Sequence, residues 1–466
     1  MSGFHRSLGL WDATMLVAGS MIGSGIFIVS AGMMRDLGSP AWLLVAWVVA
    51  GVLTVLAALS YGELASMMPK AGGQFVYLER AYGRLTAFLY GWTAFTVITS
   101  GIIAAVAVAF AKFSAVFFPV LSPDNVLLDL GFMRVSAAQV YAVSAILLLT
   151  WFNTRGVESS KTFTTVFTTA KIAALLALIV VGLAVGLGTD VLASNFTDGW
   201  RAATEAADGT LTPLTGAALL SALGVAMVGS LFSSDGWNSI TFIAGEVKEP
   251  QQNIPRSLAL GTFIVTLLYV LANITYLSLL PSEGVMHAEA DRVGTAAAEV
   301  IMGSAAVSVM AVLIMVSTFG CINSYVLTGP RMYYAMSREG LFFKQAGTLS
   351  AKGVPQWALW VQCAWSCVLC FSGTYGDLLD YATFASLLFY IVTIAGIFIL
   401  RNREPEAPRP YKAFGYPLVP ALYIVCALGF CLNLLVFKPA FTLGSLVIVG
   451  LGALVYLVTM RTRPSA

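Results

Sequence analysis

"SMIGSGIF", residues 20–27, places Gly23, Ser24 and Gly25 in succession within the first long apolar segment of the chain. Glycine is a poor helix former because it loses more backbone freedom on folding than any other residue. Gly19 and Gly23 have the spacing of a GxxxG helix-packing face, which is the structural interpretation of this stretch. The added serine polarity favours another interpretation, in which the helix is broken so that its backbone can bind a ligand.

The composition around this stretch is that of an integral membrane protein. Of the 466 residues, 58% are hydrophobic and only 10% are charged, whereas soluble domains carry about 25% charged residues. Twelve stretches are long enough to cross a hydrocarbon core, which needs about 20 apolar residues. They are continuous rather than alternating, which excludes a β-barrel. We expect twelve transmembrane helices, near residues 11–35, 41–67, 85–115, 136–153, 161–188, 215–245, 257–280, 302–334, 356–373, 376–400, 416–437 and 440–460.

The loop charges predict the orientation of these helices. With twelve crossings both termini lie on one side, and the loops on that side carry most of the loop Lys and Arg residues, among them Arg80, Arg155 and Arg401. The opposite loops carry mainly Asp and Glu. The positive-inside rule therefore predicts cytoplasmic termini. The first apolar run is too long for a signal peptide, so we expect a multi-pass protein of the plasma membrane.

A second weakened segment lies five helices further along the chain. In "LFSSDGWNSITF", residues 231–242, Ser233, Ser234, Asp235, Gly236 and Asn238 are concentrated in the sixth predicted span. The Asp235 carboxylate lies about 15 Å from the cytoplasmic end of this span, given a helical rise of about 1.5 Å per residue. A charged side chain at that depth is costly and indicates function. A pair of interrupted helices at matching positions of two halves indicates a transporter binding site.

The two breaks offer complementary binding groups. The N–H groups at the start of the half-helix near Ser24 to Ile26 lie at a positive dipole end, which suits a carboxylate. A break also exposes backbone groups that need partners. We expect free carbonyl acceptors near Met21, Ile22 and residues 232–235, and these suit an ammonium group. One anion site beside a set of acceptors predicts a receptor for a zwitterionic α-amino acid.

Motifs along most of the chain resemble one known family. "GSMIGSGIF" and "FSSDGWNSITF" resemble the amino acid–polyamine–organocation (APC) superfamily, in particular its L-type amino acid transporter (LAT) branch. Further similar motifs are "GSP" at 38–40, "LSYGEL" at 59–64, "AGGQFVYLERAYG" at 71–83, "EVKEPQQNIPRSL" at 246–258 and "MSREGLF" at 336–342. The resemblance implies a secondary active transporter of L-amino acids that works by alternating access, and not an enzyme.

The resemblance also implies an architecture, the LeuT-type fold. The chain is then one transporter domain over residues 1–466, all-α, with helices one and six unwound at mid-membrane. A first repeat at about 11–188 and an inverted second repeat at about 215–400 are followed by two peripheral helices at about 416–460.

Site residues follow from the resemblance position by position. Gly23, Ser24 and Gly25 match the turn that binds the substrate carboxylate. The carbonyls of Met21, Phe232 and Asp235 match those that accept from the amino group, and the Phe232 ring matches the aromatic that closes over the substrate. The expected substrate-binding set is Met21, Ile22, Gly23, Ser24, Gly25, Phe232, Ser234, Asp235, Gly236, Trp237 and Asn238.

Lys171 is a further candidate, about 15 Å into the fifth span and therefore deeper than a snorkelling lysine. Relatives of this fold that use sodium hold Na⁺ between segments one, five and eight. The resemblance implies that Lys171 replaces this cation, donating to the unwound carbonyls of segment one and to Ser317 or Thr318. In the alternative, Lys171 carries a proton through the cycle. Lys112, near the outer end of segment three, is expected to snorkel.

Other functional classes find little support. A channel needs a continuous polar pore, and an enzyme needs a catalytic set. There is no phosphate loop, and His5 and His287 lie in polar flanks. Cys363, Cys367 and Cys370 share a helix face without a His or carboxylate, so packing is favoured over a metal. We expect no cofactor, no metal and no nucleic acid, with the lipid bilayer and an amino acid as the partners.

The outer loop 116–136 contains no Cys. Human-type members that pair with a glycoprotein heavy chain use a Cys in this loop. We therefore expect a stand-alone, bacterial-type protein of the inner membrane without a disulfide-linked heavy chain. A sodium-independent exchanger of neutral amino acids is favoured. A carrier of cationic amino acids and a proton-coupled symporter stay open, because the sequence does not tell whether Asp235 points into the cavity.

Overall fold

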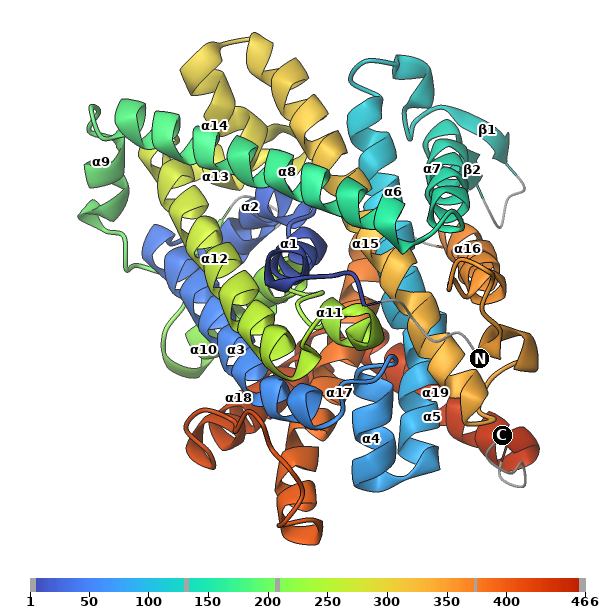
Figure 1. The fold of residues 1–466 in the computed structure, drawn as a ribbon. Helices are drawn as coiled ribbons and strands as arrows, with labels where there is room; N and C mark the ends of the chain where they lie inside the picture. Colours follow the sequence, from blue (N-terminus) through green and yellow to red (C-terminus); the bar gives the residue numbers. More distant parts are fainter. Residues whose placement is uncertain (1–5, 130–133, 206–209, 373–374, 461–466) are drawn as a thin grey trace.

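The computed structural model describes residues 6–129, 134–205, 210–372 and 375–460. Most of them belong to helices packed into a single bundle (Figure 1). The α-helices are α1 (Leu10–Met21), α2 (Gly25–Leu37), α3 (Pro40–Met67), α4 (Gln74–Tyr82), α5 (Arg84–Thr93), α6 (Thr99–Ser114), α7 (Ala137–Asn153), α8 (Val157–Gly186), α9 (Val191–Thr197), α10 (Gly216–Ser233), α11 (Ser239–Phe242), α12 (Pro250–Leu279), α13 (Ser282–Met286), α14 (Val293–Met302), α15 (Ala305–Arg338), α16 (Gln356–Leu369), α17 (Tyr375–Arg403), α18 (Leu418–Phe437) and α19 (Pro439–Val455).

Shorter helical turns complete the path of the chain. Two of them are π-helical, η1 (Ala94–Ile98) and η6 (Tyr456–Met460). The 3₁₀ turns are η2 (Pro119–Leu121), η3 (Ala244–Glu246), η4 (Glu289–Asp291) and η5 (Lys344–Gly347).

Many of these helices are long enough to span a membrane. Within the described ranges, nine helices have the length and apolar composition of a membrane span, and the pair α1 and α2, bent by 41°, adds a tenth. α7 and α16 occupy the places of predicted spans four and nine, but they have only 17 and 14 residues. Nine or ten spans are thus found by length and composition, and the count of twelve stays a prediction.

Two short β-hairpins depart from the all-α expectation. β1 (Val126–Asp129) pairs antiparallel with β2 (Arg134–Ser136), and β3 (Ala203–Glu205) pairs antiparallel with β4 (Leu211–Pro213). Both hairpins lie in loops between predicted spans. Strands of three or four residues are too short to show a clear alternating pattern in the sequence, which is why the sequence did not predict them.

The broken first helix lies in the interior of the bundle. α1 packs against α8, α12 and α15, and α2 packs against α10. Figure 1 shows α8 crossing over α1, with α12 and α15 on its two sides. The gap between α1 and α2 is therefore surrounded by helices from both halves of the chain.

Glycines explain how closely α1 approaches its neighbours, and they separate the two interpretations of the GxxxG spacing. A Cβ atom at Gly19 would lie 2.2 Å from Thr168 Oγ1, whereas one at Gly23 would meet nothing nearer than Cys321 Sγ at 3.5 Å. Gly19 is thus required for packing against α8. Gly23 has no such requirement, so packing alone does not explain the Gly-Ser run.

Candidate functional site

The first break separates α1 from α2 by three residues, Ile22 to Ser24. Ile22 leaves the helix with extended backbone angles, φ −74° and ψ 100°. The Lys171 ammonium of α8 fills the gap. Its Nζ donates to the carbonyl oxygens of Gly19 at 2.7 Å, Ile22 at 2.6 Å and Ser317 at 3.3 Å. The side chain is only 2% exposed, so the protein itself provides the lysine's hydrogen-bond acceptors.

α15 holds the same break from the other side. The Ser317 hydroxyl lies 3.2 Å from the Ile22 carbonyl oxygen and 3.0 Å from that of Gly23. Thr318 does not join this group, contrary to one of the two expected arrangements. Its hydroxyl donates to Ile314 O, at 2.8 Å, within its own helix. Position 318 therefore faces the α15 backbone rather than Lys171.

The second break follows α10 and leaves residues 234–238 without regular helix before the four-residue α11. Gly236 adopts φ +85°, a region that favours glycine. A Cβ atom there would lie 2.4 Å from the Tyr325 hydroxyl and 3.0 Å from Ser20 O. The turn of segment six thus packs directly on the last turn of α1, and the two breaks meet.

One hydroxyl joins the two breaks. Tyr269 of α12 lies 3.0 Å from both Met21 O and Ser233 O. The expectation of free carbonyl acceptors was therefore wrong for several positions, because Met21 O and Ile22 O already have donors and Phe232 O accepts from the Asp235 N–H at 3.0 Å. Each carbonyl oxygen has two lone pairs, so a ligand can still share it. The sequence around Tyr269 carries no signal that distinguishes this tyrosine.

Replacing Tyr269 with phenylalanine should reduce the transport expected from the sequence about three- to tenfold, because a hydrogen bond of this kind is worth about 0.5–1.5 kcal/mol. The matched control is Tyr276→Phe on the same helix, where the buried hydroxyl has no partner among the described residues. Initial uptake rates of both variants should be measured in proteoliposomes at equal protein content. Equal rates in the two variants would show that the bridge is dispensable.

Asp235 is held by hydroxyl groups of α17. The Tyr390 hydroxyl donates to Asp235 Oδ1 at 2.5 Å, and the Ser386 hydroxyl lies 3.5 Å from Oδ2. The structure shows no ion pair for Asp235 within the ranges it describes. The Trp237 ring packs against two tyrosine rings: its centroid lies 5.1 Å from that of Tyr390 and 4.7 Å from that of Tyr61. The carboxylate is thus engaged by the scaffold rather than by Lys171.

Asn238 is committed to a chain of buried polar side chains. Its Nδ2 donates to Gln74 Oε1 at 3.2 Å, and Gln74 Nε2 donates to Thr393 Oγ1 at 2.9 Å. Gln74 opens α4, the short helix after α3, and sequence reasoning did not identify it as a site residue. The "AGGQ" motif therefore brings α4 against the second break and α17.

Two small cavities adjoin Asp235. One, of about 20 Å³, is lined by residues that include Gln74, Gly236, Asn238 and Tyr325. The other, of about 30 Å³, lies toward α3 and α18 and includes Ser234 and Trp237. Since one water needs about 10–15 Å³, each holds a few waters at most. The amino acid expected from the sequence would fit here only if these helices moved apart.

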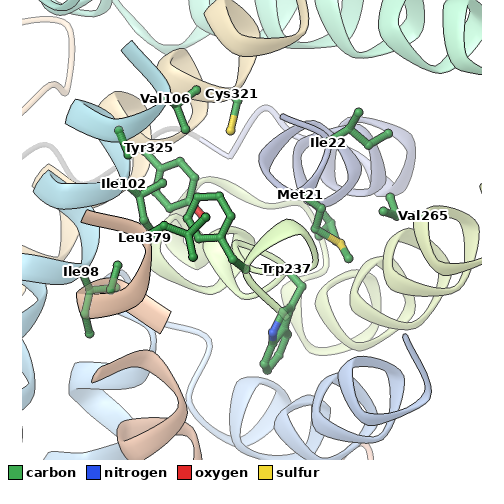
Figure 2. Close-up of a cluster of buried hydrophobic side chains, with 14 of the residues drawn as sticks. Met21, Ile22, Ile98, Ile102, Val106, Trp237, Val265, Cys321, Tyr325 and Leu379 are labelled. Carbon is green, nitrogen blue, oxygen red and sulfur yellow. The ribbon is translucent and has the colours of Figure 1, made fainter. Parts of the chain in front are cut away.

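The predicted site residues divide into two groups. Those of the second break line the cavities, whereas residues 21–25 and Phe232 line neither of them. Figure 2 shows Met21 and Ile22 on one side of the view, and Tyr325 and Leu379 on the other beside Ile98, Ile102 and Val106. Apart from Lys171, Ser317 and Thr318, which flank the breaks, all predicted members nevertheless lie in the two adjoining breaks or within two residues of them.

Comparisons with known proteins bear on this geometry. The sequence profile of a family described as "Amino acid permease" matches residues 8–458. The chain is 29% identical over 454 residues to "Large neutral amino acids transporter small subunit 2" of Mus musculus, covering 94% of this chain and 81% of that protein. It is 29% identical over 422 residues to "Asc-type amino acid transporter 1" of Homo sapiens, covering 90% of this chain and 76% of that protein. It is 28% identical over 445 residues to "b(0,+)-type amino acid transporter 1" of Mus musculus, covering 94% of this chain and 84% of that protein.

Proposed function

Because the chain belongs to the amino acid permease family, we propose that it is a sodium-independent exchanger of neutral L-amino acids. Membership makes it an amino acid transporter of the APC superfamily, a multi-pass membrane protein and not an enzyme. It also implies a LeuT-like fold. The finer architecture is part of the proposal: twelve spans, inverted repeats at about 11–188 and 215–400, peripheral helices at about 416–460, and both termini in the cytoplasm of a bacterial-type cell.

The Lys171 ammonium is the observation that carries the sodium-independent part of the proposal. Three carbonyl oxygens surround its nitrogen, and carbonyl oxygens are also the ligands that hard cations prefer. A second cation bound to these three carbonyl oxygens would face a fixed positive charge a few ångströms away, which is strongly unfavourable in a buried site. This cradle of carbonyl oxygens is thus suited to one cation, and the Lys171 ammonium is that cation.

The two breaks are suited to the polar ends of an α-amino acid. The first N–H groups of a helix have no intrahelical acceptor, so the start of α2, at Gly25 and Ile26, presents donors to a carboxylate with Gly23 and Ser24 beside them. The ammonium would share the carbonyls of Met21, Phe232 and Asp235. Ser234, Gly236, Trp237 and Asn238 would surround the side chain once the cavities widen.

The surroundings of Asp235 favour neutral substrates over cationic ones. A cationic substrate side chain would need the carboxylate as a charge-assisted partner. Tyr390 and Ser386 already engage both of its oxygens. The name of one relative, "Large neutral amino acids transporter small subunit 2", agrees with this choice. A cationic amino acid carrier and a proton-coupled symporter are the second candidates.

Uptake into proteoliposomes tests this proposal directly. We expect labelled alanine or leucine to enter faster when the vesicles contain unlabelled amino acid, and to enter equally in Na⁺ and in choline buffers. Excess arginine should compete at least tenfold more weakly than excess leucine, and Asp235→Asn should leave that ranking unchanged. Strong Na⁺ dependence would overturn the cation assignment. Arginine competition that equals leucine's and disappears in Asp235→Asn would establish the cationic alternative, and uptake driven by a pH gradient the symporter.

The placement in the LAT branch and the stand-alone state are also proposals. The loop 116–136 contains no Cys for a disulfide to a heavy chain. The same vesicles, which contain this chain alone, test this point. Exchange by the purified chain supports a stand-alone transporter, whereas exchange that requires an added second protein contradicts it.

A further inference from the structure

The helical segment formed by α5, η1 and α6 contains one irregular turn. Between α5 and α6 the chain forms the π turn η1, and the Thr99 N–H reaches back to the Ala94 carbonyl. Such turns insert one extra residue into an α-helix and often occur at functional sites. Removing the extra residue would rotate everything that follows by about 100° around the helix axis.

The last residue of this turn, Ile98, and the first residue of α6, Thr99, face the second break. Ile98 and Thr99 line the cavity that also contains Asp235, Gly236 and Asn238. Figure 2 shows Ile98, Ile102 and Val106 along the same helix, on the side of Tyr325 and Leu379. The rotation set by the π turn therefore decides which α6 side chains border this cavity.

A side chain from α16 is bonded to the π turn. The Trp365 Nε1–H donates to the Thr96 carbonyl oxygen at 3.0 Å, and its ring stacks on that of Phe95 with centroids 6.3 Å apart. α16 packs against both α6 and α15, but none of its residues lines either cavity at Asp235. Trp365 does not border that cavity itself, but the turn that it holds does.

We propose that Trp365 is a positioning residue for substrate selection: its indole N–H fixes the π turn, and the π turn orients Ile98 and Thr99 toward the substrate side chain. This inference rests on the proposed function, because it assigns the α6 wall to the part of the site that senses side-chain size. It gives α16, which provides none of the predicted binding residues, a defined role in transport.

The chain contains a closely matched control. Trp92 donates its Nε1–H to the Ile448 carbonyl oxygen, also at 3.0 Å, but this bond leads to the peripheral helix α19. Trp365→Phe and Trp92→Phe each remove one indole hydrogen bond to a backbone carbonyl and keep an aromatic ring. Only the first should change the substrate cavity.

The transport arm of the test compares the KM of leucine with that of alanine. We expect Trp365→Phe to change this ratio about three- to tenfold, the range that one hydrogen bond is worth, and Trp92→Phe to leave it unchanged. In an Ile98→Ala background, Trp365→Phe should have no further effect, because the two residues act through one turn. An unchanged ratio in folded Trp365→Phe, an equal change in Trp92→Phe, or additive effects with Ile98→Ala would overturn the proposal.

A second arm needs no substrate and separates this inference from the proposed function. Amide hydrogen exchange over residues 94–102 should be faster in Trp365→Phe than in the unmodified protein and in Trp92→Phe, since the turn has lost its anchor. Faster exchange in a protein that transports no amino acid would refute the proposed function but keep the role of Trp365 in the turn. Equal exchange in all three proteins would refute that role.

Discussion

Lys171→Ala should lose at least about 100-fold in transport rate while the protein stays folded. The substitution leaves the buried carbonyl oxygens of Gly19 and Ile22 without their strongest donor. An unsatisfied buried acceptor costs about 1–3 kcal/mol, and about 1.4 kcal/mol corresponds to a factor of ten. The loss should appear in the initial rate of amino acid exchange, since the carbonyls belong to the break itself.

The control for this variant is Lys112→Ala, which removes a lysine that lies exposed near the end of α6. Its exchange rate should stay within about twofold of the unmodified protein, as for most surface substitutions. Thermal melting of both variants in detergent shows whether they are folded. A Lys171→Ala protein that exchanges at the normal rate would mean that the ammonium does not hold the break.

Gly25→Ala is the second variant from which we expect a severe loss. Its new Cβ would lie 2.1 Å from Ser233 Oγ, 2.9 Å from Ser233 Cβ and 3.2 Å from Ser233 Cα. The two breaks would have to move apart, and overpacking of this kind costs about 1–3 kcal/mol. Exchange should fall at least tenfold, and Gly25→Leu should abolish it. Gly429→Ala in α18, where the added carbon meets no atom within 4 Å, should exchange normally.

A second substitution in the Gly25→Ala protein distinguishes two reasons why position 25 requires glycine. If Gly25 is needed because α2 and α10 touch at Ser233, then adding Ser233→Gly should restore much of the activity of Gly25→Ala. If Gly25 is needed so that a substrate carboxylate can approach the backbone, the double variant should stay inactive at normal stability. Substrate affinity, measured by competition, distinguishes the outcomes.

The places where helices break could be predicted because the signal is local. Runs of Gly, Ser and Asp weaken a helix wherever the rest of the chain lies, and both predicted breaks, residues 22–24 and 234–238, occur in the structure. The depth of Lys171 along its helix is equally local, but depth alone indicated only a buried lysine. The resemblance to the family predicted its place beside the first break, where the structure has the ammonium.

The partners of these groups could not be predicted because they are distant in the sequence. Tyr390 meets Asp235 across 155 residues, and Tyr269 meets Met21 across 248. A tyrosine within an apolar helix looks the same whether its hydroxyl bridges two broken helices or, like that of Tyr276, meets no partner among the described residues. The donors that occupy the exposed carbonyls therefore came only from the structure, as did the π turn before α6.

The covalent attachment of the Lys171 ammonium to α8 has a consequence for cellular energetics. A metal ion in such a cradle can leave on the other side of the membrane, and one elementary charge moving through 100 mV gains about 2.3 kcal/mol. The lysine nitrogen cannot leave, and only its proton could. While it stays charged, the exchange of neutral amino acids proposed above would move no net charge, so the membrane voltage could not drive accumulation. Under that proposal the cell would gain one amino acid only by releasing another that it already holds in excess.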